Sequence, residues 1–220
     1  MSKSSQGGFT IIEVVISVAI SSIIAALFLT ISLRYTSEIL RARINADMAI
    51  ESEILLRSMI DDTRLADALS QTNILADSNS PVGGWTTSDP SNVIIIESPA
   101  IDSDRNIIYN STTGFPYKNE IIYYGSGSTM YKRILKNPDA PGNTAVTSCP
   151  ANLATASCPA DKEFTKYLKD LAFTFYDDSD ATTADPSMAR SVKITVTTER
   201  KVGGDNVTFA NSIRTTLRNK

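Results

Sequence analysis

The chain has 220 residues, of which 42% are hydrophobic and 20% are charged, and its formal net charge at pH 7 is −3. This is the composition of an ordinary globular protein, and its slight acidity creates no overall field that favours nucleic acid. Histidine is absent, which removes the commonest general base and the commonest nitrogen ligand of metal sites.

The first strong pattern is an apolar run from Phe9 to Leu33 whose only charged residue is Glu13. As a helix this run would be about 37 Å long, enough to cross a hydrocarbon core of about 30 Å. From 34 to 69 the chain continues without Pro or Gly, with apolar residues near one stripe and charges elsewhere. We therefore expect one long helix, membrane-spanning over 9–33 and amphipathic over 34–69.

Glu13 is the exception in the apolar run. A carboxylate inside a membrane helix costs roughly 2.5–3.5 kcal/mol, which indicates a function with a specific partner. Glu13 lies one helical turn after Phe9. If the chain were cut after Gly8, the new α-ammonium of Phe9 would be complementary to Glu13 of a second copy stacked with an axial offset.

The segment Gly8-Phe9-Thr10-Ile11-Ile12-Glu13 resembles the class III leader junction of type IV prepilins and type II secretion pseudopilins. The resemblance implies that residues 1–8 are a leader, that a prepilin peptidase cuts after Gly8 and N-methylates Phe9, and that Glu13 pairs with a neighbour's N-terminus during assembly. Thr30 stands where major pilins usually have a helix-bending proline, which favours a minor subunit. A secretory signal peptide or an ordinary anchor fits less well, because no A-x-A-like site ends the run and neither would need Glu13.

Residues 70–92 are rich in Ser, Asn, Asp, Gly and Pro and are expected to form a connecting loop. Trp85, the only tryptophan in the chain, could be a ligand platform, but an isolated aromatic residue in such a loop more often packs the loop onto the domain. We favour packing.

Short segments with β-type patterns follow, and a hairpin is expected around 125–128. They show no alternation of strands with helices, so an antiparallel sheet packed on the long helix is expected over 70–220, an α+β fold. The expected strands are 93–97, 107–109 as a weaker candidate, 120–124, 130–135, 171–176, 192–197 and 207–217.

The C-terminal half resembles, more loosely, minor pilins of the PilW type and J-type pseudopilins. The segments that carry this resemblance are 171–177, 189–196 and 212–219. It implies a minor subunit near the filament tip that initiates assembly with other minor subunits.

Cys149 and Cys158 are the only cysteines. A domain on the outer side of the membrane lies in an oxidising compartment, where a disulfide that clamps the intervening loop is the first interpretation. A zinc site is the alternative, but histidine and a second cysteine pair are missing from the sequence.

Two charged groups are candidate binding sites. Asp178, Asp180 and Asp185 could hold calcium, although the EF-hand pattern is absent and a solvated turn is favoured. The basic cluster Lys132, Arg133 and Lys136 could bind DNA or a host surface, which would make the head an uptake receptor or a tip adhesin. Basic residues on a hairpin are usually ordinary surface, and we favour that interpretation.

The sequence therefore predicts a structural subunit without cofactor rather than an enzyme: a minor pilin that initiates or caps a pilus, or a minor pseudopilin of a secretion system. The resemblance implies as partners prepilin peptidase, other major and minor pilins, and the inner membrane before assembly. The head would be periplasmic or extracellular.

Overall fold

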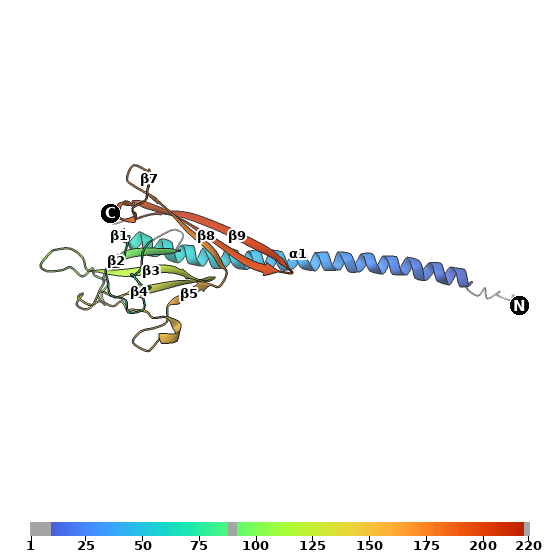
Figure 1. Ribbon diagram of the computed structural model, residues 1–220, viewed down its shortest axis with the longest axis horizontal. Helices are drawn as coiled ribbons and strands as arrows, with labels where there is room; N and C mark the ends of the chain where they lie inside the picture. The colour runs from blue at the N-terminus through green and yellow to red at the C-terminus, as the bar shows by residue number, and fades with distance from the viewer. Residues whose placement is uncertain (1–9, 88–91, 218–220) are drawn as a thin grey trace.

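The computed structural model describes residues 10–87 and 92–217. Its first element is α1, Ile11–Leu65, a single helix of 55 residues. Figure 1 shows the N-terminal half of α1 as an isolated rod and the C-terminal half packed against two sheets, which we call the head together with their connecting segments. The predicted α+β architecture, a long helix on antiparallel sheet, is confirmed.

The helix is shorter at its C-terminal end than the predicted 34–69. It stops at Leu65, and Ala66 has an extended backbone. The amide of Asp67 donates to the carbonyl of Glu97, and β1, Ala68–Ser70, pairs with β2. Because Ala66 and Leu69 are fully buried, pairing with the sheet places these residues in the core, and this gain outweighs their tendency to continue the helix.

The first sheet is antiparallel, with its strands in the order β1-β2-β3-β4-β5. The predicted hairpin is β3–β4, which turns at Gly127 and Ser128. The weaker candidate 107–109 is not a strand, because Ile107 and Tyr109 form only isolated bridges. Beyond β1, the strands are β2 Val93–Pro99, β3 Lys118–Ser126, β4 Thr129–Leu135 and β5 Lys162–Thr165.

The second sheet has the order β7-β6-β8-β9 and is also antiparallel. The β8–β9 hairpin lies along α1 (Figure 1), and an ion pair joins Asp205 at its tip to Arg41 of the helix. The elements are β6 Leu168–Tyr176, β7 Thr182–Thr183, β8 Ser191–Val202 and β9 Asp205–Thr216, with short 3-10 helices η1 Ala151–Leu153 and η2 Pro186–Met188.

Three groups of buried apolar side chains hold the head together. The main core lies where Leu55 and Met59 of α1 meet both sheets. A smaller group, Ile44 and Met48 with Val202, fixes the β8–β9 hairpin to the helix. The third lies on the other side of the first sheet and contains Trp85, Val93, Ile95, Ile122, Tyr124 and Leu135.

Candidate functional site

The N-terminal half of α1 has the properties of a membrane span. Among the described residues, α1 is the one helix long and apolar enough to cross a membrane, and none of its most apolar window is buried inside the protein. The hydroxyls of Ser17, Ser22 and Thr30 donate to the carbonyl four residues earlier. These polar groups are therefore satisfied within the helix, as a lipid environment requires.

Glu13 lies at the very start of α1 and forms a capping box with Thr10. The amide and the hydroxyl of Thr10 each donate to Oε2 of Glu13 at 2.9 Å, and the Glu13 amide donates to the Thr10 hydroxyl at 3.3 Å. Among the described residues, Oε1 of Glu13 accepts no hydrogen bond. The carboxylate is thus held at the positive end of the helix with one oxygen available. Gly8 and Phe9, the predicted cleavage and methylation residues, lie outside the described residues.

The head is bound to α1 by buried polar contacts as well as by its core. The hydroxyl of Tyr123 donates to Asp62 at 2.5 Å, Lys132 pairs with the same carboxylate at 2.6 Å, and Thr165 donates to Glu51 at 2.6 Å. Burial, reinforced by the charge of Asp62, raises the pKa of Tyr123 far above its ordinary value. The phenol is therefore a permanent donor to the helix.

The basic residues of the hairpin were expected at its surface, and for Lys132 and Arg133 this expectation is wrong. Lys132 is turned toward α1, and the side chain of Arg133 is only 1% exposed. In β4, alternate residues face opposite sides of the sheet, and segments distant in sequence cover the side that carries Arg133. The cluster therefore no longer argues for binding of DNA or of a host surface.

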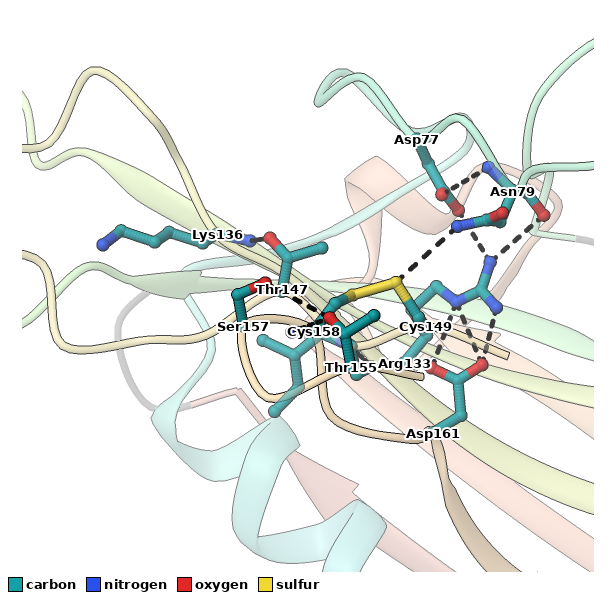
Figure 2. The surroundings of a disulfide bond; sticks show 12 residues. Asp77, Asn79, Arg133, Lys136, Thr147, Cys149, Thr155, Ser157, Cys158 and Asp161 are labelled. Carbon is teal, nitrogen blue, oxygen red and sulfur yellow. Dashed lines mark hydrogen bonds and ion pairs between the residues drawn. A yellow bond between two sulfur atoms is a disulfide. The ribbon is translucent and has the colours of Figure 1, made fainter. Parts of the chain in front are cut away.

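Arg133 is the centre of a buried polar network on the outer side of the first sheet. Its guanidinium forms a 2.6 Å ion pair with Asp161 and a 2.9 Å ion pair with Asp77, as Figure 2 shows. It also donates to the carbonyl of Asn79 and to the hydroxyl of Tyr124. Asp161 in turn accepts hydrogen bonds from Tyr124 at 2.7 Å and from Ser148 at 2.6 Å.

The ionisation states of this network follow from its contacts. Burial opposes the charge of Arg133, but hydrogen bonds to Asp161 and Asp77 outweigh it and raise the pKa of Arg133. Burial likewise opposes ionisation of Asp77, yet hydrogen bonds from Trp85, Asn79 and Arg133 hold its pKa below the usual value. The network is therefore charged and internally paired, which is the form in which buried charges are tolerated.

The structure pairs Cys149 with Cys158 in a disulfide, with their Cα atoms 5.6 Å apart. The Cys149 amide donates to the carbonyl of Pro159, and the Asp161 amide donates to the carbonyl of Cys149. Figure 2 places the disulfide beside the Arg133 network, where Nδ2 of Asn79 approaches Sγ of Cys149 at 3.9 Å. The disulfide-closed loop thus fixes the position of the following segment, in which Asp161 pairs with Arg133.

The calcium candidates have partners within the protein. Asp180 pairs with Arg214, Asp178 lies 3.9 Å from Arg190, and Asp185 caps η2 through the amide of Ser187. Over residues 10–87 and 92–217, no three His, Cys, Asp or Glu side chains are grouped so that they could hold a metal ion. These contacts do not bring the three carboxylates together on one ion.

Sequence reasoning missed the Arg133 network. Its three charged residues, at positions 77, 133 and 161, lie in separate segments and share no motif. The only available signal was the β-type alternation of 130–135, which places Arg133 on the same face as Tyr131 and Leu135.

Comparison with known families finds a match for the N-terminal segment. Residues 3–29 match the model of the prokaryotic N-terminal methylation motif, and this match spans the Gly8-Phe9 junction, Glu13 and the start of the membrane helix. This match supports a type IV pilin or pseudopilin. No curated protein sequence matches it.

The long apolar helix and the antiparallel head agree with a pilin-like architecture. The class III leader implies processing by prepilin peptidase and assembly with other pilins. The type IV pilin family is structural rather than enzymatic, and the long apolar N-terminal helix fits a membrane-anchored pilin.

Proposed function

We propose that the protein is a minor type IV pilin, cut after Gly8, N-methylated at Phe9 and incorporated into a pilus whose assembly it initiates or caps. Before assembly it would be held in the inner membrane by α1, with the head on the outer side. The observation that carries the proposal is the methylation motif at residues 3–29, which includes the start of an uncovered apolar helix.

The geometry of Glu13 supports the assembly step. The carboxylate belongs to the first turn of a helix that would lie in lipid, and Oε2 is bound to Thr10 of the same chain. The other oxygen, Oε1, can accept a hydrogen bond from the methylated α-ammonium of a neighbouring subunit. Pairing of the two groups would remove the cost of leaving either charge alone in the apolar layer.

A minor rather than a major subunit is supported by Thr30, which takes the place of the proline that usually bends the helix in major pilins. Thr30 donates to the carbonyl of Ala26, and α1 continues through this position without interruption. The second candidate is a minor pseudopilin of a type II secretion system, because segments 171–177, 189–196 and 212–219 resemble J-type pseudopilins as well as minor pilins of the PilW type. In the structure the first two of these segments belong to adjacent strands, β6 and β8.

The test is the N-terminal mass of the protein from membranes with and without prepilin peptidase, followed by assembly of variants. The wild type should begin at N-methylated Phe9 only when the peptidase is present. Glu13→Ala should still be processed but be lost from sheared filaments by at least about tenfold, because its neighbour's ammonium would lack a partner.

Ser17→Ala is the matched control, because this hydroxyl lies one turn further along the same helix and, within the described part of the chain, bonds to the Glu13 carbonyl alone. It should assemble like the wild type. A chain that still begins at Met1, or one cut beyond Leu33, would overturn the proposal. Recovery with secretion pseudopilins instead of pili would select the second candidate.

A further inference from the structure

An open pocket of about 420 Å³ lies on the outer side of the first sheet, beside the Arg133 network. Its volume falls within the range of about 300–1,000 Å³ that is usual for small-molecule sites. The residues used in the argument are Trp85, Tyr124 and Tyr131 as aromatic lining, with Asn79, Ser126 and Asn152 as polar lining. None of them belongs to the membrane helix or to the sheet that packs along it.

The aromatic lining is a continuous series of rings. The centroids of Trp85 and Tyr124 are 4.6 Å apart, and those of Tyr124 and Tyr131 are 5.4 Å apart in a stacked arrangement. Tyr131 is the half-buried member, whereas Trp85 and Tyr124 are 7% and 9% exposed. Because the rings already contact one another, no slot between two rings is open, and a ligand would stack on one platform only.

The charged groups beneath the rings are already fully used within the protein. Nε of Arg133 donates to Asp161, and each terminal nitrogen has two acceptors: Asp77 and Asn79 for one, Asp161 and Tyr124 for the other. The five donors of the guanidinium are therefore satisfied. With one cation and two carboxylates the network has a net charge of −1, so it does not attract an anion.

The remaining polar groups of the pocket are neutral. Among the described residues, the side chains of Ser126 and Asn152 and the hydroxyl of Tyr131 make no hydrogen bond within the protein. Asn152 lies in η1, inside the loop that the Cys149–Cys158 disulfide closes. The disulfide thus closes the loop from which a neutral amide lines the pocket.

We propose that this pocket binds a neutral pyranoside. The apolar C–H face of a pyranose ring would stack on Tyr131, and its hydroxyls would bond to Asn152 and Ser126. An acidic sugar would meet the net negative charge of the network, and a base stacked on Tyr131 is distinguished from a sugar by the adenosine titration below. The inference concerns the head alone and is independent of how the subunit assembles.

The protein carries its own reporter, because Trp85 is its only tryptophan and lines the pocket. The full chain, kept in a detergent without a sugar headgroup, would be titrated with methyl β-glucopyranoside, methyl β-galactopyranoside and N-acetylglucosamine. Sodium glucuronate and adenosine would be the comparison ligands. At least one neutral sugar should produce a saturable change in Trp85 fluorescence at concentrations where the comparison ligands produce none.

Tyr131→Ala and Asn152→Ala should each weaken this binding about tenfold, since each removes one stacking or hydrogen-bonding contact. Leu153→Ala is the matched control: it is the next residue of η1, it is exposed, and it does not line the pocket. It should bind within about twofold of the wild type. An unchanged near-ultraviolet circular dichroism signal of Trp85 would show that a variant remains folded.

Three results would each overturn the proposal. The first is no saturable response to any of the three neutral sugars. The second is stronger binding of glucuronate or adenosine, which would assign the pocket to an anion or a base. The third is equal binding by Asn152→Ala and Leu153→Ala in folded protein, which would place the sugar elsewhere.

Discussion

Arg133 carries a charge in a place where the protein excludes water. Its side chain is 1% exposed, and the side chains of its partners Asp77 and Asp161 are 3% and 2% exposed. Such a network is acceptable only while each member has its partners, because an unpaired buried charge retains the full cost of its desolvation. The guanidinium also lies 5.4 Å from the ring centroids of Trp85 and Tyr124, which adds stacking to the ion pairs.

We predict that Arg133→Leu lowers the free energy of unfolding by about 3–5 kcal/mol, because it leaves two buried carboxylates without their cation. Urea unfolding followed by Trp85 fluorescence measures this change, since Trp85 donates to Asp77 at 2.7 Å. Lys136→Ala, three residues away, should change the stability by no more than about 0.5 kcal/mol. Equal effects of the two substitutions would contradict the network described above.

At the scale of single residues, the burial of Trp85 was predictable from the sequence and the burial of Arg133 was not. Trp85 packs its loop onto the sheet as expected, with an exposed fraction of 7%. Arg133 was expected at the surface, because a hairpin considered alone exposes one face. That face is covered by residues 77–85 and by the segment after Cys149, and a local pattern contains no information on such distant coverage.

At the scale of elements, the strands with clear alternation were predictable, and the short strands were not. β2, the β3–β4 hairpin, β6, β8 and β9 lie where the pattern of apolar residues placed them. β1 was missed because Ala68–Ser70 has no β-type pattern and forms a strand only by pairing with Ile95–Glu97. The C-terminal boundary of α1 was wrong for the same reason, since long-range pairing overrides local helix propensity.

The Cys149–Cys158 loop is the element whose stabilising effect is most directly measurable. We predict that the double variant Cys149→Ser/Cys158→Ser loses about 2.7 kcal/mol of stability, because the unfolded chain regains the entropy that closure of a ten-residue loop removes. Urea unfolding under oxidising conditions measures the loss. Reduction of the wild type should give the same decrease, and reduction should leave the double variant unchanged. A double variant as stable as the oxidised wild type would show that the loop is held by its hydrogen bonds alone.

Considered as a whole, the molecule is divided along one helix. The membrane half of α1 contributes nothing to the interior of the protein. The outer half supplies buried residues from Ile44 to Thr63. The helix therefore has two roles that do not overlap in sequence: one face of its second half completes the core of the head, and its first half is left for lipid or for other subunits.

This division predicts different results for two truncated chains. A chain that begins at Arg34 should unfold at the same urea concentration as the full protein in detergent, because no side chain from 10 to 43 is buried. A chain that begins at Ile50 should be less stable by about 3 kcal/mol or more, because it lacks Ile44 and Met48, which pack with Val202 of the β8–β9 hairpin.

The exposed ion pair between Arg41 and Asp205 allows a control for this comparison. A chain that begins at Asn45 would lose Ile44 and the ion pair but keep Met48, and we expect it to fall between the other two. Exposed ion pairs contribute little, so Arg41→Ala in the full chain should change the stability by less than about 1 kcal/mol. If removal of residues 1–33 alone destabilised the head, the membrane half of α1 would have to contact it, contrary to the separation of the two halves of the helix.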